Sequence, residues 1–246
     1  MGCVDVIHYH GTPVSGPIDN AARFLAGRHA FISYAAPGQL EVAAEACQSF
    51  ALDNGAFSTW KRGAVLDIDA YQKWVGDWLH HPGCDWHVIP DIIDGDEANN
   101  RALARSWPFP AALSVPVWHM HESIGYLVDL AENFPRIAIG SSGQWPSPGV
   151  GSWWSRMAVA LDAICPGSRP MTKIHGLRML DPEIFTRLPL ASADSTNAAR
   201  NCAMDSKWRT YAPRHQWQRA GVIADRIEAQ NSAPTLSGNI QLCIGF

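Results

Sequence analysis

Cysteine is scarce in this sequence, and its few cysteines are not arranged as a disulfide framework or a zinc module requires. Six cysteines are spread over 246 residues without a CxxC pair or a zinc-ribbon spacing. This disfavours a small disulfide-built fold, and we expect reduced thiols in a cytoplasmic protein. The cysteines are Cys3, Cys47, Cys84, Cys165, Cys202 and Cys243.

Long apolar runs and an excess of positive charge are also missing. No run approaches the roughly 20 apolar residues that cross a bilayer, and no basic-then-apolar leader opens the chain. Val6 stands where a myristoylation signal has Ser or Thr. The formal net charge is -4, so the protein as a whole is not a polycation. We therefore expect no membrane partner, and nucleic-acid contacts would have to come from a local basic patch.

The sequence does contain enough apolar residues for a large core, in a repeating order. Hydrophobic residues make up 47% of the chain. Short runs rich in branched residues alternate with helix-like segments at 67–81, 95–107, 122–134 and 152–164, which predicts parallel strands joined by helices. The predicted strands, eight in number, are 4–9, 30–34, 49–53, 86–91, 113–119, 136–140, 172–177 and 189–194.

This order predicts an α/β fold, a single (β/α)8 TIM-type barrel over residues 1–246. In such a barrel the carboxyl ends of the strands meet at one mouth, where active sites lie whatever the chemistry. The chemically active residues at the predicted strand ends are His10, Asp53, Asn54, Asp91, His119, His121, His175 and Asp194.

Three aspartates, Asp53, Asp91 and Asp194, stand among these residues. Two carboxyl groups on opposite sides of a sugar can split a glycosidic bond, one as nucleophile and one as proton shuttle. Crowded like charges would also raise the pKa of at least one of them. Each aspartate has a structural interpretation too: Asp53 could form a turn with Gly55, Asp91 or Asp94 could cap the helix at 95, and Asp194 could cap the next segment.

Five short segments resemble the tRNA-guanine transglycosylases, in the order in which that family has them. "LDNGAFSTW" (52–60) resembles the segment of their essential aspartate, and "SADSTNAARN" (192–201) resembles their nucleophile segment. "VIPDIID" (88–94) is similar to the strand whose aspartate binds the guanine-like base, and "IAIGSSG" (137–143) to a backbone contact with that base. "KIHGLRMLDPEIF" (173–185) is similar to a further family stretch.

The chain also departs from the tRNA enzymes. Their CxCxxC-plus-His zinc site is missing, since only Cys202 and Cys243 follow the nucleophile segment, and Val117 to His121 replace a Val-Gln-Gly-Gly strand end. The chain is therefore most similar to the short phage and bacterial DNA-guanine transglycosylases of the DpdA group, which insert 7-deazaguanine bases into DNA. If phage-encoded, it would act in the host cytoplasm. The tRNA enzymes dimerise through the zinc subdomain, so the oligomeric state stays open.

The resemblance implies a cofactor-free and metal-free exchange of guanine in DNA for a 7-deazaguanine base such as preQ0 or a preQ1-like derivative. Asp194 would attack C1′ and expel guanine, Asp53 would act as general acid and base, and Asp91 would bind the Watson–Crick edge. A base must leave the helix to react, so stacking surfaces are expected, with Phe57, Trp118 and Trp145 as candidates. The implied base contacts are Asn54, Gly55, Phe57, His119, Gly140, Ser141, His175 and Gly176.

A basic and aromatic segment at 200–219 is the candidate for holding DNA. Within it, "KWRTYAPRHQWQR" (207–219) has four cations and no acid, interleaved with Trp208, Tyr211 and Trp217. Cations of this kind contact phosphates, and aromatic rings stack on unpaired bases. The alternative is a solvated loop whose aromatics pack on helices. The expected nucleic-acid contacts are Asn197, Arg200, Lys207, Arg209, Arg214 and Arg219.

Two other classes of function stay open at this point. His8 and His10 lie two apart on one strand, as in metal-dependent amidohydrolases, and a zinc centre could activate water for hydrolysis. That hypothesis gives "DNGAF" no role. A non-catalytic barrel that binds modified bases is the third class, and intact Asp53 and Asp194 argue against it. The residues of the metal hypothesis are His8, His10, His119, His121, His175 and Asp194.

Overall fold

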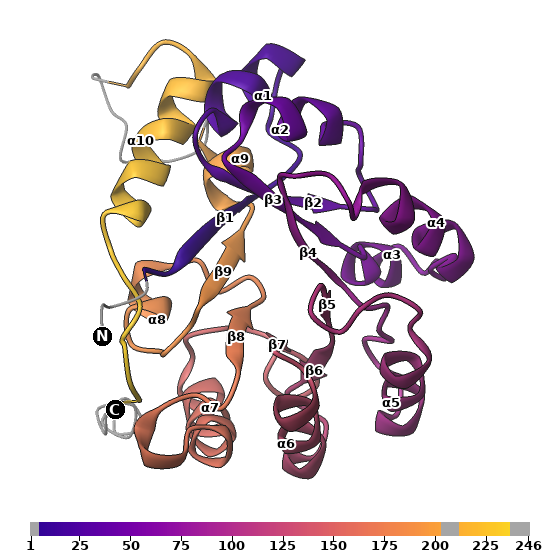
Figure 1. The fold of residues 1–246 in the computed structure, drawn as a ribbon. Helices are drawn as coiled ribbons and strands as arrows, with labels where there is room; N and C mark the ends of the chain where they lie inside the picture. The colour runs from indigo at the N-terminus through magenta and orange to yellow at the C-terminus, as the bar shows by residue number, and fades with distance from the viewer. Residues whose placement is uncertain (1–4, 203–211, 237–246) are drawn as a thin grey trace.

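The strands of the protein form one parallel sheet that is nearly closed into a barrel, compatible with a TIM-type barrel (Figure 1). The computed structural model describes residues 5–202 and 212–236. The strand order is β5-β4-β3-β2-β1-β9-β8-β7-β6. The strands are β1 (Ile7–Gly11), β2 (His29–Ser33), β3 (Ser49–Asp53), β4 (Cys84–Val88), β5 (Ser114–Val115), β6 (Val117–His119), β7 (Arg136–Gly140), β8 (Lys173–Gly176) and β9 (Ser192–Ser195).

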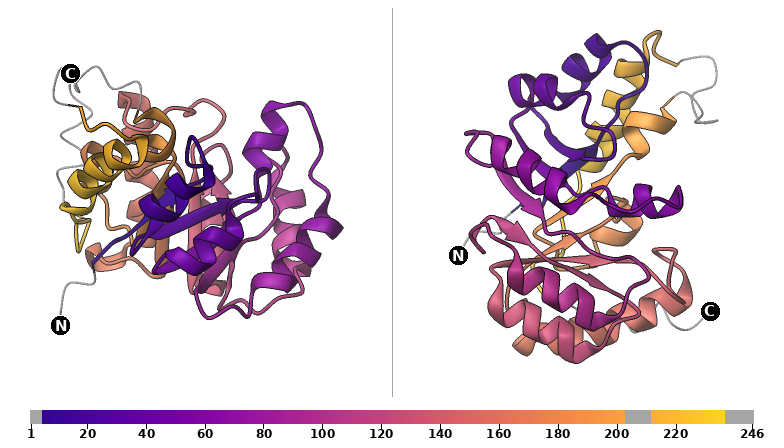
Figure 2. Two further views of the ribbon diagram at one scale, coloured as in Figure 1. Left: turned by 90° about the horizontal axis from the view of Figure 1, so that it is seen from above. Right: turned by 90° about the vertical axis from the view of Figure 1, so that its right-hand side faces the viewer.

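Helices follow the strands and cover the outside of the sheet (Figures 1 and 2). The α/β class predicted from the alternation of strand-like and helix-like segments is confirmed. The helices are α1 (Ile18–Leu25), α2 (Leu40–Ala46), α3 (Ala56–Lys61), α4 (Ile68–Trp78), α5 (Glu97–Ser106), α6 (Ile124–Asn133), α7 (Gly151–Ile164), α8 (Pro182–Phe185), α9 (Asn197–Asn201) and α10 (Gln216–Glu228), with a 3-10 turn at Pro166–Ser168.

The predicted strand at 113–119 was wrong as a single element, because Pro116 interrupts it. Proline has no backbone N–H to donate to a neighbouring strand. Before it, β5 pairs with β4, and after it, β6 pairs with β7. The carbonyl of Pro116 still accepts a hydrogen bond from the backbone N–H of Ala138 at 2.9 Å. The two open ends of the sheet are therefore consecutive pieces of one segment, which explains why the barrel is nearly closed.

Polar caps fix where several helices begin. Asp67 accepts a hydrogen bond from the N–H of Ala70 at the start of α4, and Asp96 accepts one from Asn99 at the start of α5. Each cap satisfies a backbone donor that has no partner within the helix. The cap of α5 is thus Asp96, so neither Asp91 nor Asp94 is needed for that role.

The side chains of β1 show how the sheet separates two apolar layers. Tyr9 points into the barrel, where its ring contacts Phe31 and Trp86. His8 and His10 point to the outside, where His8 contacts the ring of Phe185 and His10 that of Phe24. This follows from the two-residue period of a strand. The barrel interior is therefore filled below the strand ends, and the open space lies above them.

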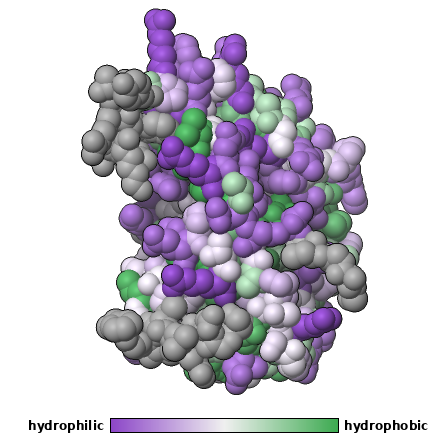
Figure 3. Space-filling view, turned by 90° about the vertical axis from the view of Figure 1, so that its left-hand side faces the viewer, coloured by the Kyte–Doolittle hydropathy of each residue, from purple (hydrophilic) through white to green (hydrophobic). Residues whose placement is uncertain are grey.

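The outer surface on the α10 side is mainly hydrophilic, with small hydrophobic patches scattered over it (Figure 3). Within residues 5–202 and 212–236, none of the helices combines the length and the apolar character needed to cross a bilayer. The longest described helix, α7, has 14 residues, against the roughly 20 that a span requires.

Candidate active site

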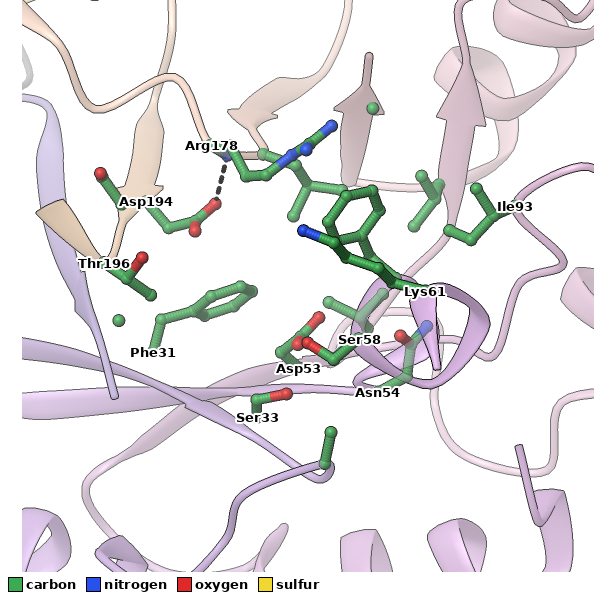
Figure 4. Close-up of a pocket in the computed structure, with 18 of the residues that line it drawn as sticks. Phe31, Ser33, Asp53, Asn54, Ser58, Lys61, Ile93, Arg178, Asp194 and Thr196 are labelled. Atoms are coloured by element: carbon green, nitrogen blue, oxygen red, sulfur yellow. Dashed lines mark hydrogen bonds between the residues drawn. The ribbon is translucent and has the colours of Figure 1, made fainter. Parts of the chain in front are cut away.

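A cavity of about 660 Å³ opens at the carboxyl ends of the strands (Figure 4). Its volume lies in the usual range of small-molecule sites, roughly 300–1,000 Å³. Residues at the ends of β1, β2, β3, β6, β7 and β9, and in the loops after β4 and β8, line it. The residues predicted from the sequence that line it are Asp53, Asn54, Phe57, Asp91, His119, Gly140, Ser141, Asp194 and Arg200.

Asp194, on β9, is buried, with 6% of its surface exposed at the cavity wall. Its Oδ1 accepts a hydrogen bond from the backbone N–H of Arg178 at 2.8 Å (Figure 4). Within the described residues, no hydrogen-bond donor contacts Oδ2. Asp194 does not cap α9, since the N–H of Asn197 donates to Ser195 instead. One carboxylate oxygen is thus held and the other is available.

His175 supports Asp194 from below. Its Nε2 lies 3.4 Å from Asp194 Oδ1, and its Nδ1 lies 2.9 Å from Ser192 Oγ. Arg136 donates a hydrogen bond to the same Ser192 oxygen at 2.9 Å. Because Arg136 can only donate, the Ser192 hydroxyl is free to donate to Nδ1, which leaves the imidazole hydrogen on Nε2 facing Asp194. Burial lowers the pKa of His175, so the ring is neutral.

Asp53 ends β3 and lies on the cavity wall beside Ser33 (Figure 4). Its Oδ2 accepts a hydrogen bond from the N–H of Gly55 at 3.1 Å, so the predicted turn is present as well. Burial, reinforced by the negative charges of Asp194 and Asp91, raises the pKa of Asp53 to about 7. A carboxyl group with this pKa can both give and take a proton at neutral pH.

Gly55 turns the chain from β3 into α3 with φ of 72°. A Cβ at this position would lie 2.6 Å from the backbone nitrogen of Ala35. Only glycine combines this left-handed conformation with such a close approach. Gly55 therefore shapes the loop that carries Asp53 and Asn54.

Asp91 is held from two sides at the cavity wall. Asn54 donates to its Oδ1 at 2.5 Å, and His119 Nε2 lies 2.8 Å from its Oδ2. Burial acts to lower the pKa of His119, but the hydrogen bond and charge of Asp91 raise it overall. His119 is itself held by Glu122, whose Oε2 accepts a hydrogen bond from the backbone N–H of His119 at 2.7 Å. Asn54 and His119 thus act through Asp91 by fixing its orientation.

Arg178 is a site residue that the sequence did not single out. Besides holding Asp194 through its backbone, it donates from its guanidinium to the carbonyl of Ser141 at 3.1 Å. Its guanidinium carbon lies 4.2 Å from the centre of the Phe57 ring. Arg178 has φ of 59°, a conformation that favours glycine. It lies within the stretch 173–185, but no pattern of residue types marked it as part of the cavity.

Several predicted residues lie away from the cavity. His175 and Gly176 are buried beneath it, and Trp118 is buried among the residues that α6 and α7 pack against. Trp145 packs against that same cluster, and Arg156 contacts its ring. These residues support the walls and do not line the space.

The described part of the basic segment 200–219 is divided between the cavity and the outer surface. Arg200 lines the cavity, whereas Arg219 donates to the carbonyls of Pro213 and Arg214. Trp217 packs against the apolar layer outside the barrel, with the guanidinium of Arg23 over its ring. Asn197 and Arg214 are exposed, and the predicted contacts Lys207 and Arg209 lie outside the described residues. The cations that line the cavity are Lys61, Arg62, Arg178 and Arg200.

The residues of the metal hypothesis do not come together. His10 lies 2.7 Å from Glu228, and His8 lies 3.0 Å from the carbonyl of Gln230, both outside the barrel. His119 and Asp194 instead face the interior cavity. Within the described part of the chain, no group of three or more His, Cys, Asp or Glu side chains is arranged to hold a metal ion. The two-residue spacing does put His8 and His10 on one face, but that face is the outer one.

The sequence matches no family model and no curated protein. The resemblance to guanine transglycosylases therefore remains a prediction from short segments.

Proposed function

We propose that the protein is a base-exchange transglycosylase that replaces guanine in DNA with a 7-deazaguanine base through a covalent bond between Asp194 and C1′. Two aspartates line one cavity in complementary states, since Asp194 has a free oxygen and the pKa of Asp53 is raised to about 7. This pairing supplies a nucleophile and a proton shuttle for one glycosidic bond.

In the first step, Oδ2 of Asp194 attacks C1′ of a deoxyguanosine. The C1′–N9 bond breaks, its electron pair goes to guanine, and guanine takes a proton from Asp53. In the second step, Asp53 removes the N9 proton of the incoming 7-deazaguanine as N9 attacks C1′. The C1′–Oδ2 bond then breaks, and Asp194 leaves as a carboxylate. These steps need no cofactor, because Asp53 regains the proton that it gave and Asp194 regains its electron pair.

Asp91 is suited to select the base. Guanine and its 7-deaza derivatives present two hydrogen-bond donors, N1–H and the exocyclic amine, and a carboxylate is their natural acceptor. Asn54 and His119 fix this carboxylate, so its remaining lone pairs keep one direction. Gly140 and Ser141 line the cavity and complete the wall beside it.

The proposed architecture is a (β/α)8 barrel in which β5 and β6 count as one strand interrupted by Pro116. DNA is preferred to tRNA as the substrate because the chain lacks the cysteine spacing of the zinc-binding part that the tRNA enzymes have. The cations Lys61, Arg62 and Arg200 at the cavity suit a phosphate backbone.

Exchange of radiolabelled guanine or preQ0 into plasmid DNA and, in parallel, into bulk tRNA tests the proposal. Wild type, Asp194→Ala and Asp53→Ala are compared, with Asp69→Ala as the matched control because Asp69 is exposed in the first turn of α4. We expect label in DNA alone, lost in both site variants and retained in the control. Label that enters neither the plasmid, intact or heat-denatured, nor tRNA would reject the proposal.

A further inference from the structure

The surface of α3 beside the cavity exposes two aromatic rings. Trp60 is 45% exposed and Phe57 is 37% exposed. Among the described residues they are the only exposed Phe, Trp or Tyr side chains. They lie three apart on one face of the helix, with ring centres 5.9 Å apart and planes inclined by 36°. Exposed aromatics of this kind, where the other described Phe, Trp and Tyr rings are buried or half-buried, indicate a surface that binds a ligand.

These rings extend a chain of contacts that starts at Asp194, the proposed nucleophile. The backbone of Arg178 holds Asp194, and the guanidinium of Arg178 lies 4.2 Å from the centre of the Phe57 ring. Phe57 is followed by Trp60, farther along α3. Arg178, Lys61 and Asp194 face the same open space (Figure 4). The base of a nucleotide next to the target could therefore stack on the rings of Phe57 and Trp60.

The charge of this surface fits an anionic partner. Lys61 and Arg62 follow Trp60 directly, and residues 56–66 contain no Asp or Glu. Among the described residues, neither cation has a carboxylate oxygen within 4.0 Å, whereas Arg28 and Arg101 each form ion pairs. Arg62 uses only its Nε, which donates to the carbonyl of Ser58. Both charges remain available to phosphates.

We propose that the α3 surface, defined by Phe57, Trp60, Lys61 and Arg62, binds an unpaired nucleotide that neighbours the target in the DNA strand. The inference rests on the proposed function and specifies its substrate as single-stranded or locally melted DNA. A base within an intact duplex has both faces covered by its neighbours and cannot stack on Trp60. Aromatic rings interleaved with cations bind unpaired strands through this combination of stacking and phosphate contacts.

The test is fluorescence anisotropy with a labelled guanine-containing oligodeoxynucleotide, single-stranded or annealed to its complement. The variants are Trp60→Ala, Trp60→Phe and the double variant Lys61→Ala with Arg62→Ala. The controls are Ile18→Ala, because Ile18 is an exposed apolar residue of α1, and Arg169→Ala, because Arg169 is exposed after α7. Thermal unfolding of every variant shows whether the fold is kept.

We expect the single strand to bind the wild type more tightly than the duplex does. Trp60→Ala should weaken single-strand binding about tenfold, and Trp60→Phe should restore most of it, since a base stacked on an aromatic ring is sensitive to alanine substitution by roughly this amount. The double variant should lower the salt slope of binding by about 1.4, because each phosphate contact with a single strand contributes about 0.7. Both controls should bind like the wild type.

Unchanged single-strand binding by Trp60→Ala, or tighter binding of the intact duplex, would overturn the inference. Base exchange measured on the same oligonucleotides separates this result from failure of the proposed function. If base exchange persists but DNA binding does not depend on Trp60, only the proposed role of the α3 surface is rejected. If DNA binding depends on Trp60 but no base is exchanged, the proposed function is rejected and the α3 surface is still a DNA-binding surface.

Discussion

Replacing Asp53 with asparagine should make the protein more stable at alkaline pH. Burial raises the pKa of Asp53 from 3.8 to about 7 in the native state, whereas an aspartate in an unfolded chain titrates near 3.9. The native state therefore binds the proton more tightly than the unfolded state does. The contribution of protonated Asp53 to native-state stability is therefore complete below about pH 4 and is lost as pH rises through 7. An asparagine side chain carries no charge and avoids this loss.

The size of the effect follows from the shift. A difference of about 3 pKa units corresponds to about 4 kcal/mol at 1.36 kcal/mol per unit, which is an upper bound. Asp53 reaches the cavity, where solvent screens its charge, so we expect a gain of about 2 kcal/mol at pH 8. For a domain of this size, that gain raises Tm by about 4–8 °C.

Urea and thermal unfolding of wild type and Asp53→Asn at pH 4, 6 and 8 measure the gain. The free energies of unfolding should nearly coincide at pH 4 and separate progressively up to pH 8, while the variant loses base exchange. Asp69→Asn, at an exposed carboxyl group, should follow the wild type at every pH. A variant that is no more stable than the wild type at pH 8, or one with the same offset at all three pH values, would refute the electrostatic reasoning about Asp53.

Three further predictions concern the groups around the aspartates. Ser192→Ala removes the hydroxyl between Arg136 and His175, so kcat for exchange should fall about tenfold with KM for DNA unchanged; a KM effect instead would show that Ser192 does not act through Asp194. Gly55→Ala should lower the free energy of unfolding by about 2 kcal/mol or more, since the positive φ and the contact with Ala35 both oppose a Cβ; urea unfolding at the wild-type level would contradict this. Asp91→Asn should raise KM for the incoming base at least tenfold in exchange kinetics, with kcat affected less; an unchanged KM would remove Asp91 from base selection.

The α/β class could be predicted because apolar runs of strand length alternate with amphipathic segments, a pattern that burial imposes directly on the sequence. The break in the fifth strand could have been found at Pro116, whose missing N–H is visible in the sequence. By contrast, α2 and α10 gave no clear signal. Leu40 and Ala43 are the buried residues of α2, too few for a visible period. The start of α10 looks like a basic loop in the sequence. Trp217 packs against residues far away in the chain, such as Arg23, and Arg219 folds back onto the carbonyls of Pro213 and Arg214, and neither contact leaves a local pattern.

Site residues could be predicted where the residue type alone, at the end of a strand, indicates a chemical role. Asp53, Asp91 and Asp194 all line one cavity, as the barrel geometry requires. Arg178 was missed because its role depends on an unusual backbone conformation and on Phe57 lying opposite. His8 and His10 were grouped correctly on one face of β1, but the period of two does not tell the inner face from the outer one. Tyr9 packs inside the barrel, so its neighbours His8 and His10 point outward.

The most direct test of the central claim is the intact mass of the protein after incubation with a guanine-containing oligodeoxynucleotide, followed by peptide mapping. We predict an adduct with the mass of the oligonucleotide minus guanine, equimolar free guanine, and a bond at Asp194. The adduct should disappear when preQ0 is added and should never form with Asp194→Ala. Guanine release without an adduct, or an adduct that survives in Asp194→Ala, would contradict the assignment of Asp194 as the nucleophile.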